Sequence, residues 1–260
     1  MDQPKPTSNT ASRRPMKQLS KPWPSTRLLG IPVDCPRRED LLATLLAHLR
    51  ARGASSHIVT MNAEMAYSAS EDPAFFQLLQ QADVIIPDGI GVVWALGHAG
   101  VKVQRLPGVE LVEALFKAAA QTPIKLAILG SSEETLLAFQ AQMPERFGAV
   151  ELVYARNGYF TQVDEAEILT ALQQAAPDVL FVALGVPRQE AWIAQHRADL
   201  NIPVMMGVGG SFDVLSGRLN RAPAWMRSMH LEWLYRLLQQ PSRWRRMLAL
   251  PKFVLKVLRR

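Results

Sequence analysis

An aspartate directly follows a short apolar run in the first third of the chain. Val84, Ile85 and Ile86 predict a buried strand that ends at Pro87, and two glycines after Asp88 allow a tight turn before an apolar helical stretch. Asp88 is therefore expected at the carboxyl end of a strand, where open α/β sheets bind their ligands. A carboxylate there can act as a general base. The alternative is that Asp88 only caps the following helix, a position that Asp favours.

Three further polar loops follow predicted strands, at residues 60–64, 130–132 and 185–190. Because the carboxyl ends of parallel strands meet at one edge of a sheet, we expect these loops to gather near Asp88. The loop at 130–132 begins a predicted helix, whose free backbone N–H groups suit a phosphate. Each loop alone is ordinary, but together they predict a site for a nucleotide and a polar partner.

Sequence patterns for common cofactors and metals are absent. The segment from Gly207 offers the first two glycines of a dinucleotide fingerprint, but Phe212 stands at the third position. The Walker pattern is missing, and five scattered histidines, one cysteine and no Asp-X-Asp pair give no metal-ligand spacing. We therefore expect no metal and no cofactor, and arginines rather than a cation to stabilise an anionic leaving group.

Basic residues concentrate near the C-terminus. Residues 221–260 hold ten Lys or Arg and one acid, a net charge of +9, whereas the rest of the chain sums to −3. Arg236, Arg243 and Arg246 have the spacing of one helix face, although Pro241 interrupts that helix. Trp, Leu and Met surround them, which favours a segment that lies on an anionic membrane surface. A docking helix with a solvated basic face is the alternative.

Strand and helix patterns alternate through most of the chain. The strands are apolar throughout, which predicts a Rossmann-like α/β fold with a mainly parallel sheet and helices on both faces. Residues 1–26 are rich in Pro, Ser, Thr, Lys and Gln and predict a disordered leader. We expect the α/β core at 27–216 and a C-terminal helical, basic appendage at 217–260.

The sequence favours a cytoplasmic protein. No apolar run approaches the roughly 18 residues that a membrane span needs. The N-terminal segment has no apolar stretch typical of a secretory signal. A single cysteine, Cys35, excludes an internal disulfide framework.

The motifs of this chain resemble the WecG/TagA/CpsF family of bacterial glycosyltransferases, from about residue 28 to 246. Six segments carry the resemblance: Thr-Met-Asn-Ala-Glu at 60–64, Ala-Asp-Val-Ile-Ile-Pro-Asp-Gly-Ile-Gly-Val-Val-Trp at 82–94, Arg-Leu-Pro-Gly at 105–108, Leu-Gly-Val-Pro-Arg-Gln-Glu-Ala-Trp at 184–192, Gly-Val-Gly-Gly-Ser-Phe-Asp at 207–213, and Arg-Ala-Pro at 221–223 with Leu-Glu-Trp-Leu-Tyr-Arg at 231–236. Two departures are Met61, where Pro is common, and Leu-Pro after Arg105, where Val-Thr is commoner.

The resemblance implies an inverting, metal-independent transfer of a sugar from a UDP donor to a polyprenyl-diphosphate-linked sugar. The transfer takes place on the cytoplasmic face of the cell membrane, with the protein bound peripherally to an anionic surface. N-acetylmannosamine is the typical sugar of the family, and its uronic acid or glucose are the alternatives. The product would serve cell-envelope or exopolysaccharide synthesis. Self-association is compatible with this implied function.

The resemblance also implies roles for individual residues. Asp88 matches the family's candidate general base. Thr60 and Asn62 match motif positions that the resemblance places beside the acceptor. Four arginines are expected around the acceptor and its diphosphate: Arg105, Arg236, Arg243 and Arg246. Contacts to the donor are expected from seven residues in the other loops: Gly130, Ser131, Gly185, Pro187, Gln189, Glu190 and Gly209.

Two other functions remain open at this point. A non-enzymatic module could bind a membrane or nucleic acid through the basic tail, but this leaves the loops of Asp88, Asn62 and Gln189 unexplained. We accordingly expect no nucleic-acid partner. An epimerase acting on a nucleotide sugar is disfavoured by the missing dinucleotide fingerprint.

Overall fold

The computed structural model describes residues 18–229 and 231–259. Residues 1–17 of the expected leader lie outside this part of the chain. The remainder of that leader contacts the core: Lys21 Nζ lies 3.1 Å from Asp34 Oδ1, and Trp23 Nε1 donates to the same oxygen at 3.0 Å. Lys21 and Trp23, which belong to the expected leader, therefore pack on the core.

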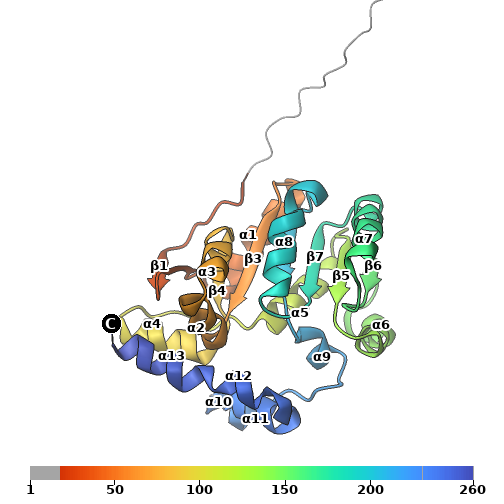
Figure 1. Cartoon of the computed structure of the whole chain (residues 1–260). Coiled ribbons are helices and arrows are strands. Elements are labelled where there is room, and N and C mark those ends of the chain that lie inside the picture. The colour runs from red at the N-terminus through yellow and green to blue at the C-terminus, as the bar shows by residue number, and fades with distance from the viewer. Residues whose placement is uncertain (1–17, 230, 260) are drawn as a thin grey trace, which may run out of the picture.

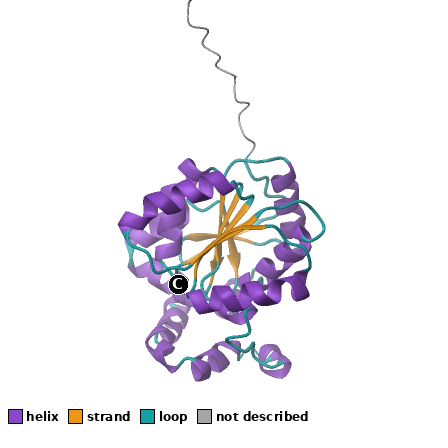
Figure 2. Cartoon of the chain, turned by 90° about the vertical axis from the view of Figure 1, so that its right-hand side faces the viewer, coloured by secondary structure: helices purple, strands orange, loops and turns teal. Residues whose placement is uncertain are grey.

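A six-stranded parallel sheet forms the centre of the molecule, with strand order β4-β3-β8-β7-β5-β6. Its strands are β3 (Ser56–Met61), β4 (Val84–Pro87), β5 (Leu126–Gly130), β6 (Leu152–Arg156), β7 (Val179–Ala183) and β8 (Val204–Gly207). The helices around it are α1 (Arg38–Arg50), α2 (Ala63–Glu71), α3 (Pro73–Gln80), α4 (Ile90–His98), α5 (Gly108–Ala119), α6 (Glu133–Phe147), α7 (Gln162–Ala175), α8 (Arg188–Leu200) and α9 (Ser211–Leu215). Figure 2 shows the strands enclosed between helices on both sides. The predicted Rossmann-like α/β fold is confirmed.

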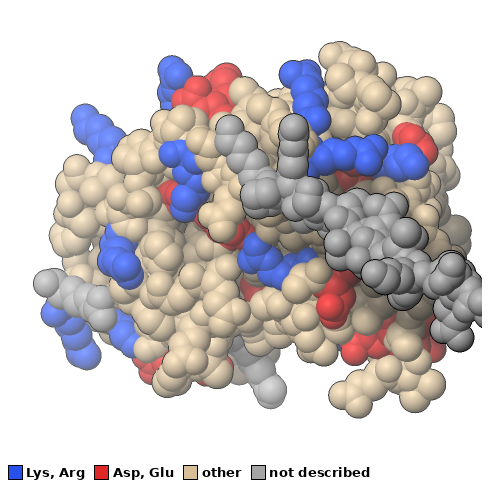
Figure 3. Space-filling view, turned by 90° about the horizontal axis from the view of Figure 1, so that it is seen from above, with Lys and Arg blue, Asp and Glu red and all other residues tan. Residues whose placement is uncertain are grey.

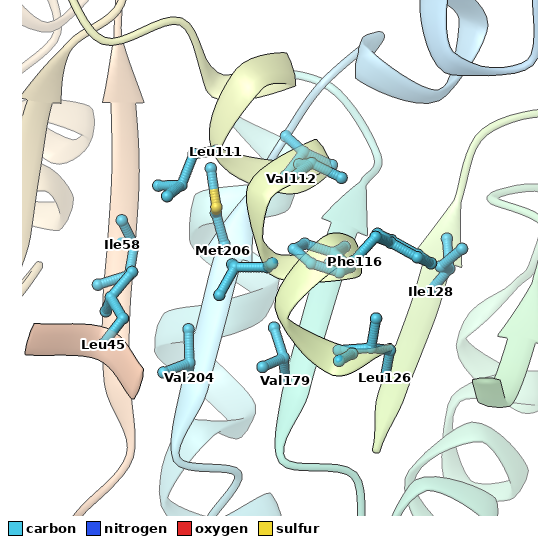
Figure 4. Close-up of a cluster of buried hydrophobic side chains, with 14 of the residues drawn as sticks. Leu45, Ile58, Leu111, Val112, Phe116, Leu126, Ile128, Val179, Val204 and Met206 are labelled. Atoms are coloured by element: carbon cyan, nitrogen blue, oxygen red, sulfur yellow. The ribbon is translucent and has the colours of Figure 1, made fainter. Parts of the chain in front are cut away.

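Both faces of the sheet are buried because successive strand residues point to opposite sides. On one face, Ile58, Ile128 and Met206 pack with α1, α5, α6 and α9, and Figure 4 shows Phe116 of α5 over this layer. On the other face, residues such as Leu180 pack with α7 and α8, while α2 and α3 cover the β3–β4 side. Two buried faces explain why the strands read as continuous apolar runs.

An antiparallel hairpin of β1 (Ser25–Leu28) and β2 (Ile31–Asp34) packs beside the edge strand β4. Leu29 and Gly30 have φ values of 52° and 88°, the left-handed conformations that a two-residue turn requires. The Asp34 carboxylate accepts a hydrogen bond from Ile85 N–H at 2.9 Å, so the exposed edge of β4 is partly satisfied.

The C-terminal appendage consists of short helices. They are α10 (Ala224–Ser228), α11 (Glu232–Gln239), the 3₁₀ turn η1 (Pro241–Arg243), α12 (Trp244–Met247) and α13 (Ala249–Leu258). In Figure 1 the helices α10 to α12 lie beyond the arrowheads of the strands, at the carboxyl edge of the sheet. The last helix returns to the core along α2, where Phe253 is 1% exposed and Lys256 Nζ donates to Ser70 O at 3.0 Å.

Charge is distributed differently at the two ends of the molecule. Viewed from above, the end opposite the appendage shows basic and acidic side chains interspersed (Figure 3). The appendage instead collects most of the excess positive charge. No helix within residues 18–229 and 231–259 has the length and apolar character to cross a membrane.

Candidate active site

The expected loops meet at the carboxyl edge of the sheet. Strands β3 and β4 are parallel neighbours, with Met61 paired to Pro87, so Asn62 and Asp88 emerge side by side. The Asp88 N–H donates to Met61 O at 2.9 Å. A Cβ added at Gly89 would lie 3.2 Å from Asn62 Cβ, so the two loops touch closely at this glycine.

Asp88 is partly buried in a charged environment. Removal from water raises its pKa to about 6, although Arg105, the Gly108 backbone and Arg236 act in the opposite direction and Glu232 adds to the rise. The carboxylate is therefore mostly ionised at neutral pH yet basic enough to take a proton. The capping alternative is wrong, because the N-cap of α4 is Gly89, with no side-chain cap bond.

A loop between α4 and α5 folds over these residues. Arg105 Nε donates to the backbone oxygen of Asp88 at 2.9 Å, and Leu106 N–H donates to Pro87 O at 2.8 Å. A Cβ added at Gly108 would lie 3.0 Å from Thr60 Cγ2. The structure thus brings Thr60, Asp88 and Arg105 together.

Thr60 and Asn62 use part of their hydrogen-bonding capacity within the fold. Thr60 Oγ1 donates to Gly207 O at 3.3 Å and ties β3 to β8. Asn62 Oδ1 accepts from Met65 N–H at 2.9 Å as the N-cap of α2. The amide nitrogen of Asn62 is consequently the atom of this pair best suited to reach a ligand.

The loop after β5 does not offer all the free N–H groups that the sequence predicted. Gly130 and Ser131 have φ values of 123° and 65°, and Ser131 N–H is already bonded to Ala183 O at 2.9 Å. Glu133 and Glu134 occupy the first turn of α6. Because carboxylates there oppose an anion, this helix start is a poor phosphate site.

Gln189 and Glu190, which were expected to contact the donor, form a buried brace at the site. Their exposed fractions are 2% and 0%. Gln189 accepts from Gly209 N–H at 3.0 Å and donates to Glu190 Oε1 at 2.7 Å. Burial raises the Glu190 pKa to about 7. Gly185 and Pro187 form the turn into α8, so the brace joins this turn to the loop after β8.

Three arginines reach the same edge from the appendage. Pro241 divides the expected helix, so Arg236, Arg243 and Arg246 belong to α11, η1 and α12 rather than to one helix face. They nevertheless converge. Burial and the charges of Arg236 and Arg246 lower the Arg243 pKa to about 10.

The arginines are anchored to the core by acceptors of the site loops. Arg236 Nη2 donates to Gly210 O at 3.1 Å, and Arg246 Nε lies 3.8 Å from Glu64 Oε1. A surface cavity of about 550 Å³ lies beside them. Its lining residues are Gln239, Gln240, Pro241, Ser242, Arg243 and Arg246. A basic, polar hollow of this kind is suited to an anionic group.

Sequence reasoning missed Glu232, which the structure places next to the other charged groups of the site. Its Oε2 lies 2.5 Å from Arg105 Nη2, and its Oε1 lies 3.7 Å from Arg221 Nε. One feature could have revealed it: Glu232 is the only acid among ten cations in residues 221–260.

Comparison with known proteins decides the family. The model of the glycosyl transferase WecG/TagA/CpsF family matches residues 26–260. The chain belongs to this family. It is therefore a glycosyltransferase, and the resemblance of its six motifs is confirmed.

Three similar proteins share one name. The chain is 36% identical over 223 residues to an N-acetylglucosaminyldiphosphoundecaprenol N-acetyl-beta-D-mannosaminyltransferase of Bacillus spizizenii, covering 84% of this chain and 86% of that protein. Proteins of the same name in Bacillus subtilis and Staphylococcus aureus are each 35% identical. They cover 78% and 77% of this chain and, in both cases, 78% of the relative.

The site of this WecG/TagA/CpsF glycosyltransferase is built from carboxylate, amide and guanidinium groups. Within the described part of the chain, no three His, Cys, Asp or Glu side chains are grouped as a metal site would require. The cations that the described residues bring to the site include Arg105 and, from the appendage, Arg236, Arg243 and Arg246.

Proposed function

We propose that this glycosyltransferase moves N-acetylmannosamine from UDP to the N-acetylglucosamine of a polyprenyl-diphosphate-linked acceptor, with inversion and without a metal. The names of the three relatives support this choice of sugar and acceptor. The uronic acid of N-acetylmannosamine and glucose are the alternative donor sugars. The product would enter cell-envelope or exopolysaccharide synthesis.

The observation that carries the proposal is the position of Asp88. It stands at the end of β4 with a pKa of about 6, under an arginine cluster supplied by the appendage. In the proposed reaction Asp88 takes the proton of an acceptor hydroxyl, whose oxygen attacks the anomeric carbon of the donor. The bond from that carbon to the UDP oxygen breaks, and UDP departs with the electron pair.

The arginines supply the electrostatic part of this chemistry. We assign Arg236, Arg243 and Arg246 to the acceptor diphosphate, and Arg105 to the surroundings of the acceptor sugar. Planar guanidinium groups bind phosphate oxygens bidentately, and a preformed cluster needs no reorganisation during the reaction. Gly130, Ser131, Gly185, Pro187 and Gly209 remain the proposed backbone wall of the donor site.

The appendage is also the proposed membrane contact. Its cations lie among apolar side chains that are more than 40% exposed: Trp225, Met229, Trp233, Leu238, Trp244, Leu248, Leu255 and Leu258. Exposed aromatic and aliphatic groups beside Arg and Lys are typical of segments that lie in the headgroup region of anionic lipid. Peripheral binding would bring the arginine cluster to the level of the lipid diphosphate.

One assay tests the proposal directly. UDP-sugars are offered one at a time with a synthetic N-acetylglucosamine-diphospho-lipid, in the presence of EDTA. Transfer from UDP-N-acetylmannosamine alone is the expected result. If no UDP-sugar is transferred but UDP still binds, the protein uses a different acceptor. If UDP does not bind either, the protein is a non-enzymatic module that binds through its basic tail.

A further inference from the structure

A network of ion pairs between alternating arginines and acids connects the core to the appendage. Arg38 and Arg221 both form ion pairs with Glu110, Arg221 lies 3.7 Å from Glu232, and Glu232 lies 2.5 Å from Arg105. We call these five residues the acid–arginine network. Its members come from α1, α5, the segment before α10, α11 and the loop after α4.

Glu232 is the member that the appendage contributes. It is the first residue of α11, and its side chain is 26% exposed, close to the 25% of Arg105 and 28% of Arg221. Partly buried ion pairs are screened less by water and salt than surface pairs. A change in the charge of Glu232 should therefore alter the electrostatic environment of its neighbours.

The neighbour that matters is Arg105, because it is shared between Glu232 and Asp88. Arg105 Nε donates to the Asp88 backbone oxygen at 2.9 Å, while its Nη2 donates to Glu232. Glu232 thus fixes the guanidinium and balances its charge. Without Glu232, an unbalanced cation beside Asp88 would favour the ionised carboxylate and weaken it as a base.

We propose that Glu232 is a positioning residue that maintains the base strength of Asp88 by holding and neutralising Arg105. This inference rests on the general-base role proposed above for Asp88. The appendage then has a second role besides supplying the arginine cluster, because Glu232, which maintains the base strength of Asp88, belongs to α11 and not to the α/β core.

The charges that face Asp88 come from three sides. Arg105 approaches from the loop after α4, Glu232 and Arg236 approach from α11, and the Gly108 backbone approaches from α5. Two cations and one acid therefore act on the carboxylate. Replacing Glu232 by a neutral residue leaves two cations unopposed, so protonated Asp88 becomes less favourable.

The first test measures Asp88 itself and needs no substrate. Carbon-13-labelled aspartate in the full chain is titrated by NMR, and the Asp88 resonance is assigned by its absence in Asp88→Asn. The midpoint should fall by roughly 0.5–1 pH unit in Glu232→Gln, within the range of one neighbouring charge. The control Glu71→Gln removes another appendage-to-core ion pair, to Lys256 of α13, and should leave the midpoint unchanged.

A double-variant cycle separates action through Arg105 from a direct effect of the Glu232 charge. In an Arg105→Gln background, Glu232→Gln should shift the midpoint by less than half as much as in the wild type. A shift of full size in that background, an unchanged midpoint in the single variant, or a rise would each overturn the proposal. Glu232→Asp keeps the charge and should restore most of the wild-type midpoint.

The same variants can be read in the transfer assay. The acid limb of kcat/KM should move to lower pH in Glu232→Gln, with kcat at pH 7.5 reduced by about two- to threefold, as expected for a slightly weaker base. If the wild type transfers no sugar while the Asp88 midpoint still falls in Glu232→Gln, the proposed function is wrong and the coupling stands. If transfer occurs and the midpoint does not move, the coupling alone is wrong.

Discussion

The guanidinium of Arg105 is bonded to the backbone oxygen of Asp88, at 2.9 Å from Nε. The local fold around Asp88 thus depends on its peptide group, which a side-chain substitution leaves in place. Chemistry and folding can consequently be separated at this position.

Asp88→Asn should abolish transfer and keep the fold. Loss of a general base typically costs 10²- to 10⁴-fold in rate, whereas the bonds of the Asp88 N–H and C=O groups persist. Steady-state kinetics and thermal unfolding of the variant measure the two effects. Asp72→Asn, at the N-cap of α3, is the matched control and should retain activity. Near-normal turnover in Asp88→Asn would remove Asp88 from the reaction.

The rate should depend on pH through the same carboxylate. Because the pKa of Asp88 is about 6, kcat/KM should be level near neutral pH and fall about tenfold per unit well below pH 6, as the base becomes protonated. A pH series at low substrate concentration measures this limb. A limb near pH 4, the range of an exposed aspartate, would contradict the buried environment described for Asp88.

Glu190→Gln should make stability less dependent on pH. The pKa of Glu190 is about 7 in the folded protein and 4.5 is its ordinary value, so the folded state binds more protons between these values and stability falls as pH rises through that window. Gln cannot ionise and its oxygen can still accept from Gln189. The variant should match the wild type near pH 4.5 and gain on the order of 3 kcal/mol above pH 7.

Urea unfolding at pH 5 and pH 8 measures this difference. The wild type should lose stability relative to Glu190→Gln as the pH is raised between the two conditions. An equal difference at both pH values would mean that Glu190 does not gain a proton on folding, and that only its packing matters.

Arg243→Gln should weaken the use of the lipid acceptor without destabilising the protein. Arg243 is partly dehydrated, and Arg236 and Arg246 repel its charge, which together lower its pKa to about 10. Removal of one relieves the repulsion but removes a phosphate ligand. We expect KM for the diphospho-lipid to rise about tenfold or more and the unfolding midpoint to stay or rise. Arg218→Gln, which removes an exposed ion pair with Glu134 at 3.9 Å, serves as the control.

The sheet and the position of Asp88 were predictable from the sequence because both depend on local patterns. Continuous apolar runs predicted the parallel strands, and a polar residue after each run predicted the edge at which the loops meet. The strand ends in the structure lie within a few residues of those expected. The turn between β1 and β2 could not be predicted in this way, because Leu29 adopts a left-handed conformation that is rare for leucine.

The electrostatics of the site could not be predicted in the same way. Whether Glu190 faces a ligand or the interior depends on its neighbour Gln189 in α8, which bonds both to Glu190 and to Gly209 in the loop after β8. The pairing of Glu232 with Arg105 joins residues 127 positions apart. Contacts of this kind follow from tertiary packing, and neither spacing nor composition specifies them.

The buried position of Phe253 has a consequence for how the protein folds during translation. Its ring is buried against α2 and α4, next to Gly91 in the first turn of α4, three residues after the proposed base. A ribosome synthesises nearly 200 residues between the end of α2 and the end of α13. The apolar face of α2 and α4 that receives Phe253 therefore stays uncovered until α13 has been synthesised and has docked.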